Sequence, residues 1–332
     1  MQNPAFLNGF SGGAFRDRFR RREARLVLGL AFALAITSLA IVQSVAAERM
    51  VRDATGRDVA VGQAQRIVTI GGAVTEIVYA LGAGDRIVAR DSTSFYPHEA
   101  LDKPDVGYMR ALSAEGVLST NPDLILAVEG SGPKEAIELL ESASVPMVVV
   151  PESYSGEGIA EKVRLIAEVL GETEKGEALA SRIDAQFAAL SSALGKLPEG
   201  ERKKVVFLMG LTGDKPLAAG SNTAGNAVIG LAGGINPMVA IPGYKPASDE
   251  ALAAAAPEAI VMMSRHGADL PTPEKVFAVP SLAATPAAAS KSLIVMDGLY
   301  LLGFGPRTAD AARDLAHQLY PSLDLPASSA AN

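Results

Sequence analysis

The sequence predicts an α/β protein with two similar lobes, each a parallel-rich sheet flanked by helices, joined by one long helix with a ligand cleft between the lobes. Three observations predict this: short β-rich runs alternate with helical patterns, one long helical stretch lies near the middle, and the segments on its two sides resemble each other. Strands that alternate with helices favour a parallel sheet covered by helices. The 332 residues suffice for about two domains at roughly 100–200 residues each.

The N-terminal lobe, residues 48–171, alternates strands with helices. Runs of β-branched and apolar residues predict four strands, at residues 66–70, 86–89, 124–128 and 146–150. The last two are continuous apolar runs, as is typical of buried parallel strands. Helical spacing of apolar residues predicts three helices, at residues 74–81, 133–143 and 156–170.

A long linking helix is predicted over residues 172–196. From 172 to 194 the chain has no proline and only one glycine, and apolar residues recur every three or four positions. The C-terminal lobe, residues 197–325, follows. Its predicted strands are 204–209, 259–263 and 293–296, and its closing helix is 308–319. We expect the tail, residues 326–332, to be disordered.

Residues 112–126 align without gaps on residues 247–261, at an offset of 135 positions. The matching pairs are Ser113 and Ser248, Glu115 and Glu250, Pro122 and Pro257, and Ile125 and Ile260. In each segment the serine can cap a short helix, and the proline ends that helix before a buried strand. Chance recurrence of helix–proline–strand units is the alternative to two related lobes.

The first 47 residues are typical of an export signal. Six arginines between Arg16 and Arg25 precede an uncharged run at residues 26–42, and small residues follow at 44–47. This order predicts a signal peptide over residues 1–47, cleaved near Ala47. An uncleaved membrane anchor is the alternative, although a run of 17 residues is at the short limit for a bilayer span.

Charge and cysteine content narrow the compartment and the partners. Without residues 1–47 the chain has 24 basic and 35 acidic residues, a net charge of −11. Such an acidic body disfavours nucleic acid and anionic membrane surfaces as partners. The sequence contains no cysteine, which excludes disulfides and a lipid-anchored cysteine. We therefore expect an unanchored protein of a Gram-negative periplasm.

Four segments resemble the periplasmic binding proteins that serve importers of haem, cobalamin and iron-siderophores, and within them the haem-binding branch. They are residues 66–77 (RIVTIGGAVTEI), 90–97 (RDSTSFYP), 106–116 (VGYMRALSAEG) and 243–246 (GYKP). The resemblance covers about residues 64–321. It implies a periplasmic haem-binding protein that delivers haem to the membrane subunits of an ABC importer and is not an enzyme. We expect it to be a monomer.

By this resemblance Tyr96 is the axial ligand of a ferric haem iron, for which a phenolate is a suitable hard anion. Tyr96 follows a predicted strand, in a loop where an α/β lobe presents ligand-binding groups. Pro97 restricts Tyr96 to an extended conformation. From the residue type alone, a surface tyrosine that packs on its neighbours is the alternative. His98 could hydrogen-bond the phenolate, contact a propionate or remain solvated.

Further haem contacts are expected on both sides of the cleft. Arg265 follows the predicted strand 259–263, and in the haem-binding branch an arginine of about this region supports the ligand. The aromatic residues Tyr108, Tyr244 and Tyr300 are expected in loops near the cleft, where each could cover the porphyrin or simply pack within its lobe. Arg110 is a weaker candidate.

The histidine content favours one haem per chain. Some haem-binding relatives hold two stacked haems with an additional histidine in the second lobe. The second-lobe histidines here are His266 and His317, and His317 falls in the predicted closing helix, where a solvated or packed histidine is expected.

Glu115 and Glu250 are the expected docking residues. By resemblance, one glutamate at the tip of each lobe pairs with arginines of the importer's membrane subunits. Two matching acids suit a two-fold symmetric partner and would mainly set docking rate and orientation. The alternative is that each is only an acidic residue in the first turn of a helix.

Other functions have less support in the sequence. A cobalamin or iron-siderophore carrier of the same fold is the main alternative. A zinc or manganese carrier would need several converging histidines and carboxylates, but the chain has only three histidines, far apart in sequence. An enzyme is disfavoured because the chain has no cysteine nucleophile, no Gly-x-Ser-x-Gly elbow and no Gly-x-x-x-x-Gly-Lys loop.

Overall fold

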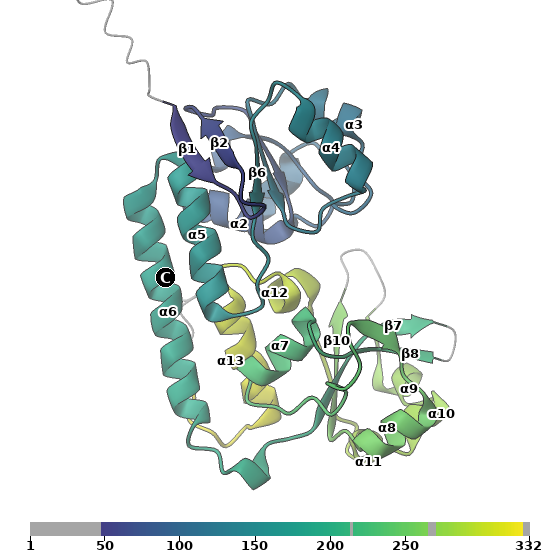
Figure 1. Ribbon diagram of the computed structural model, residues 1–332. Coiled ribbons are helices and arrows are strands. Elements are labelled where there is room, and N and C mark those ends of the chain that lie inside the picture. Colours follow the sequence, from purple (N-terminus) through teal and green to yellow (C-terminus); the bar gives the residue numbers. More distant parts are fainter. Residues whose placement is uncertain (1–47, 213–214, 265–269, 328–332) are drawn as a thin grey trace, which may run out of the picture. The chain divides into compact units, whose positions relative to one another are not determined.

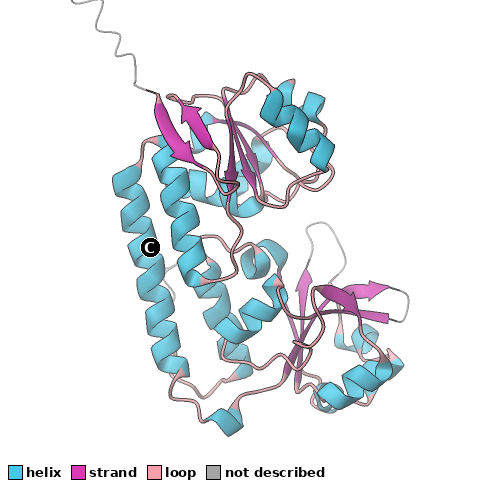
Figure 2. Cartoon of the chain, in the orientation of Figure 1, coloured by secondary structure: helices cyan, strands magenta, loops and turns pink. Residues whose placement is uncertain are grey.

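The computed structural model describes residues 48–212, 215–264 and 270–327, which belong to one compact unit that begins at Glu48 (Figures 1 and 2). The predicted signal peptide, most of the predicted tail, Arg265 and His266 lie outside these residues. A four-stranded and a five-stranded sheet with flanking helices, together with a two-stranded sheet, form the described part, so the predicted α/β architecture is confirmed.

The N-terminal sheet is entirely parallel and has the order β4-β3-β5-β6. Its strands are β3 (Ile67–Ile70), β4 (Ile87–Arg90), β5 (Leu124–Val128) and β6 (Met147–Val150). Strands β3, β5 and β6 are buried along their whole length, which explains their uninterrupted apolar sequences. An antiparallel hairpin, β1 (Arg49–Arg52) with β2 (Asp58–Val61), precedes this sheet and was not predicted.

Helices connect the strands of this sheet. The α-helices are α2 (Gly72–Ala80), α3 (Ala114–Leu118), α4 (Lys134–Ser142) and α5 (Gly156–Leu170), and the short 3₁₀ helices are η1 (Gly84–Arg86) and η2 (His98–Asp102). Gly171 ends α5 in the left-handed conformation with φ of 75°, which glycine adopts readily. The chain then reverses into α6 (Thr173–Leu194), which packs along α5 (Figure 1).

The C-terminal sheet is mixed and has the order β11-β10-β7-β8-β9. Its strands are β7 (Val205–Thr212), β8 (Lys215–Ala219), β9 (Tyr244–Pro246), β10 (Ala259–Ser264) and β11 (Leu293–Asp297). The three predicted strands form the parallel part, and β8 and β9 extend it as antiparallel strands. The helices of this half are η3 (Glu199–Glu201), α7 (Ala224–Leu231), α8 (Asp249–Ala255), α9 (Pro273–Val276), α10 (Pro280–Ala283), α11 (Pro286–Ala289), α12 (Gly298–Leu302) and α13 (Thr308–Leu319).

The internal repeat has a structural counterpart. Ser113 caps α3 by accepting a hydrogen bond from the backbone N–H of Gly116, and Ser248 caps α8 by accepting one from Ala251, both at 3.2 Å. The strands that follow, β5 and β10, begin 135 residues apart, at the offset of the sequence repeat. The two halves therefore share this helix–strand unit.

The turn between α12 and α13, residues 303–307, joins the two halves and is called the junction turn below. The Phe304 ring is completely buried in the core of the N-terminal half, among residues of α2, α5 and α6. The Phe304 carbonyl accepts a hydrogen bond from Lys162 Nζ of α5 at 3.2 Å. A segment of the C-terminal half is thus part of the N-terminal core.

Among the helices of the described residues, none has the length and apolar character needed to cross a lipid bilayer.

Candidate functional site

The loop that carries Tyr96 is fixed by a buried hydrogen-bond network. It follows β4, and the Asp91 carboxylate accepts hydrogen bonds from the Gly71 backbone N–H at 2.9 Å and from Ser94 Oγ at 2.7 Å. Thr75 Oγ1 of α2 lies 2.7 Å from Ser94 Oγ. Because Asp91, Thr75 and Ser94 are fully buried, these bonds connect the loop firmly to α2.

Tyr96 itself remains accessible, with 44% of its surface exposed. The guanidinium carbon of Arg307, the last residue of the junction turn, lies 3.5 Å from the centroid of its ring. The same carbon lies 5.2 Å from the centroid of the Tyr300 ring. Such distances are those of cation–π interactions. Arg307 therefore covers one face of Tyr96.

Arg307 is held in place by Glu76 of α2, which is 5% exposed. Arg307 Nε donates to Glu76 Oε1 at 3.0 Å, and Nη2 donates to Oε2 at 2.9 Å. Burial raises the pKa of the Glu76 carboxyl, and the hydrogen bonds from Arg307 oppose that rise. Burial lowers the pKa of Arg307, but the Glu76 carboxylate outweighs this effect and raises it. This ion pair connects the two halves of the protein directly beside Tyr96.

A hollow of about 690 Å³ adjoins Tyr96 on the side of Arg307. Its lining comes from both halves and from α6: Glu76, Tyr79, Ala80, Asp85, Tyr96, Pro97, Glu99, Asp102, Lys103, Arg182, Pro306 and Arg307. Four of these residues are acidic and three are basic. Charges of both signs therefore line the hollow beside Tyr96.

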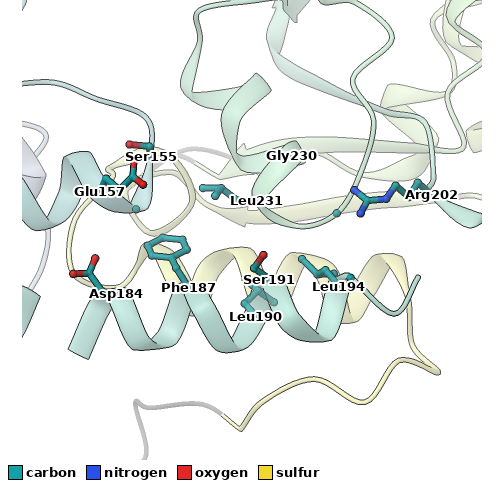
Figure 3. Close-up of a pocket in the computed structure, with 13 residues that line it drawn as sticks. Ser155, Glu157, Asp184, Phe187, Leu190, Ser191, Leu194, Arg202, Gly230 and Leu231 are labelled. Atoms are coloured by element: carbon teal, nitrogen blue, oxygen red, sulfur yellow. The ribbon is translucent and has the colours of Figure 1, made fainter. Parts of the chain in front are cut away.

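A second hollow, of about 720 Å³, runs along α6 and shares no lining residue with the first. In Figure 3, Phe187 of α6 points toward Leu231, with Glu157 at one end of the hollow and Arg202 at the other. Its lining includes no tyrosine or histidine that could coordinate iron. The candidate site therefore consists of Tyr96 and the residues around it.

Two of the predicted haem contacts have partners within the C-terminal half and do not lie in loops as expected. Tyr244 is the first residue of β9, because residues 244–246 pair with β8, and its hydroxyl accepts a hydrogen bond from the Gly225 N–H at 3.1 Å. Tyr300 lies in α12, and its hydroxyl donates to Asp314 Oδ2 at 2.8 Å. Burial raises the pKa of both phenols, and the Asp314 carboxylate raises that of Tyr300 further.

The remaining predicted contacts are solvent-exposed where they are described. Tyr108 is 47% exposed in the loop before α3, and Arg110 is exposed close by. His98 is exposed at the first residue of η2, two positions after Tyr96. His317 is exposed on α13. The structure brings Tyr96 and Tyr300 close to one arginine, Arg307.

The sequence did not single out Glu76 and Arg307 as site residues. They are 231 positions apart, so no local pattern relates them. One signal was present: residues 303–307 contain two glycines and a proline between two helical patterns, which indicates a turn that ends in a charged residue.

A second ion pair holds the other end of the junction turn. Lys162 of α5 is completely buried, and its Nζ donates to Glu152 Oε1 at 2.9 Å as well as to the Phe304 carbonyl. Burial raises the pKa of Glu152, and the Lys162 ammonium opposes that rise. Tyr154 packs edge-on against Phe304, with ring centroids 5.1 Å apart. The turn that carries Arg307 is thus bound to the N-terminal half at both ends.

Glu115 and Glu250 are exposed in the first turns of α3 and α8. They hold equivalent places in the helix–strand unit shared by the two halves. Backbone and Ser248 hydrogen bonds lower the pKa of the Glu250 carboxyl.

Residues 67–299 match the family model described as periplasmic binding protein. The solved structure "Periplasmic heme-binding protein BhuT in complex with two hemes" is 38% identical, with a TM-score of 0.73 over 78% of this chain and 99% of that chain. The uncharacterized ABC transporter substrate-binding lipoprotein YvrC of Bacillus subtilis is 26% identical over 81% of this chain and 84% of its own length. The vitamin B12-binding protein of Vibrio campbellii is 31% identical over 39% of this chain and 46% of its own length.

Proposed function

Because the chain belongs to the periplasmic binding protein family, we propose that it binds one ferric haem at Tyr96 and delivers it to an ABC importer. Members of this family are non-enzymatic components of transport systems. The chain is therefore a substrate-binding protein of an ABC importer and not an enzyme. The observation that carries the haem proposal is the exposed phenol of Tyr96 on a rigid loop, in a chain that is 38% identical to a haem-binding protein.

The chemistry of Tyr96 suits a ferric iron. A phenolate oxygen is a hard anionic ligand, as found in haem proteins of the catalase type. Arg307 lies against one ring face, so the porphyrin is expected to approach Tyr96 from the opposite side. Tyr108, Tyr244, Tyr300, His98 and Arg265 stay candidates for contact with the porphyrin or its propionates.

A hemin titration followed by absorption tests the proposal. The wild-type protein is expected to give a ferric tyrosinate-type spectrum that saturates near one equivalent. Tyr96→Ala is expected to abolish that spectrum and to weaken binding by more than about tenfold, or about 1.4 kcal/mol. Tyr108→Phe keeps the ring that could contact the porphyrin and removes only a similarly exposed phenol oxygen, so it is expected to keep the tyrosinate spectrum. A spectrum that survives in Tyr96→Ala would assign the iron ligand elsewhere, and an end point of two equivalents would refute the single haem.

Cobalamin is the second candidate ligand, followed by an iron-siderophore. Curated relatives named vitamin B12-binding protein support it, with identities of 28–31%, although the chain spans only about half of their length. If hemin gives no specific spectrum and cyanocobalamin binds saturably, the haem assignment is wrong and the cobalamin assignment takes its place.

We also propose that residues 1–47 direct export and are removed near Ala47, which leaves an unanchored periplasmic monomer. The absence of cysteine supports the lack of a lipid anchor, in contrast to the lipoprotein relative YvrC. A mass measurement on the protein from a periplasmic extract tests this, because a retained leader or an added lipid would change the mass.

Docking on the importer is assigned to Glu115 and Glu250. The double variant Glu115→Arg/Glu250→Arg is expected to bind haem normally but to reduce haem uptake through the importer by more than about tenfold, because like charges would face each other. The matched control is Glu135→Arg/Glu274→Arg, which also reverses one exposed first-turn acid in each half. Equal losses of uptake in both double variants would argue against a specific docking role.

A further inference from the structure

We infer that Glu76 and Arg307 are positioning residues for Tyr96: the buried carboxylate holds the guanidinium flat on one ring face, which fixes the ring and leaves the opposite face and the phenol oxygen for the ligand. This inference rests on the proposed function for its consequence at the haem iron. The contact between Arg307 and Tyr96 is present in the protein without any ligand.

The geometry of Glu76 supports the first step. Its two carboxylate oxygens accept two parallel hydrogen bonds, from Nε and Nη2 of Arg307, at 3.0 and 2.9 Å. Such a two-point contact fixes the plane of the guanidinium as well as its position. Since Glu76 is 5% exposed, little water can compete with Arg307 for its carboxylate.

The second step is that Glu76 and Tyr96 belong to one rigid body. The Gly71 N–H, directly before α2, donates to Asp91, and the Gly72 N–H donates to Thr93 Oγ1 at 3.2 Å. Helix α2, which carries Glu76, is therefore bonded to the loop that carries Tyr96. Arg307 contacts the Tyr96 ring from the C-terminal half, so shifts of that half can reach the ring through it.

The third step concerns the arginine itself. It is the last residue of the junction turn, whose Phe304 is buried in the N-terminal core and whose backbone is bonded to Lys162. A guanidinium can lie flat on an aromatic ring and still form a two-point ion pair in its plane. A lysine ammonium carries the same charge but cannot make both contacts, so the charge and the geometry can be separated by mutation.

The variants are expected to leave Tyr96 able to bind the iron but to make its ring less ordered. Immobilising a side chain that would otherwise be mobile improves affinity, so release of the Tyr96 ring is expected to weaken haem binding about 3- to 10-fold. It should also change the tyrosinate charge-transfer band, because the ring would bind iron in several orientations.

The test uses the full-length mature protein in two arms, with Glu76→Gln and Arg307→Lys as test variants. Glu177→Gln is the matched control. Arg164 of α5 and Glu177 of α6 also form a bidentate ion pair, with hydrogen bonds of 2.8 and 3.0 Å, but this pair is exposed. Circular dichroism and thermal melting establish that each variant is folded, and Glu76→Gln preserves the size of the buried side chain.

The first arm needs no haem. The seven tyrosines are labelled with ¹³C, and the Tyr96 ring signal is assigned with Tyr96→Phe. Glu76→Gln and Arg307→Lys are expected to shift and broaden the Tyr96 signal, and Glu177→Gln to leave it in place. A Tyr96 signal that is unchanged in both test variants would overturn the inference, whatever the protein binds.

The second arm is the hemin titration. Both test variants are expected to bind one equivalent with about 3- to 10-fold lower affinity and an altered charge-transfer band. Wild-type affinity and an unaltered band in Glu76→Gln, together with loss of the band in Tyr96→Ala, would refute the positioning role but keep the proposed function. The absence of any ferric spectrum in the wild type would refute the proposed function, while the first arm still decides the role of the pair.

Discussion

Replacing Phe304 with alanine is expected to lower the free energy of unfolding by about 3–5 kcal/mol, the usual range for an aromatic residue deleted from a core. The ring is completely buried among residues of α2, α5 and α6, although the residue belongs to the turn between α12 and α13. Phe304 also has a left-handed backbone with φ of 49°, which is unfavourable for a large side chain. Burial of its ring compensates for this conformation, so the alanine variant loses the compensation.

Urea denaturation monitored by circular dichroism measures this effect. Leu139→Ala is the control, because Leu139 is 61% exposed on α4 and its removal is expected to change stability by less than about 0.5 kcal/mol. A Phe304→Ala variant within about 1 kcal/mol of the wild type would contradict the burial of the ring. Two separate unfolding transitions in this variant would indicate that the junction turn is what makes the halves unfold together.

The junction turn also bears on how the protein handles its ligand. Phe304, the Lys162 hydrogen bond and the Arg307–Glu76 pair connect the halves within five residues of chain. All three contacts would have to break for the halves to separate widely. We therefore expect ligand binding at Tyr96 to proceed with a modest relative motion, as the single long helix α6 also indicates.

Elements with a regular local pattern were predicted closely from the sequence. The bounds of β5, α5 and α13 agree with the prediction to the residue, because continuous apolar runs or helical spacing are properties of neighbouring residues. Strands β8 and β9 were not predicted. They are five and three residues long, each contains a proline, and their place depends on pairing with β7 and with each other.

The candidate site was predicted unevenly for the same reason. Tyr96 was predicted as the iron ligand because it lies in a short motif after a strand, and that role stays a prediction; the structure has Tyr96 exposed on a loop fixed by Asp91. Asp91 and Ser94 lie in the same motif as Tyr96, but no sequence pattern indicates that Asp91 bonds Gly71 and that Ser94 bonds Thr75. Arg307 reaches Tyr96 only through the packing of two halves of the chain, and spacing carries no information on that contact.

Replacing Glu152 with glutamine is expected to destabilise the protein by about 3 kcal/mol or more, because it leaves the Lys162 ammonium buried without its carboxylate. Lys162 has no exposed side-chain surface, and its remaining acceptor in the structure is the Phe304 carbonyl. Lys134 offers the control. It pairs with Glu138 at 3.1 Å, but 84% of its side chain is exposed.

Glu138→Gln is therefore expected to cost about 1 kcal/mol or less, since water can solvate an exposed ammonium. The double variant Lys162→Met/Glu152→Gln removes the buried charge together with its partner, and we expect it to recover most of the stability that Glu152→Gln loses. Urea denaturation of the four proteins gives the comparison. Equal losses in Glu152→Gln and in the double variant would mean that the buried charge is not the source of the effect. Recovery in the double variant would show that the uncompensated charge of Lys162 causes the loss in Glu152→Gln.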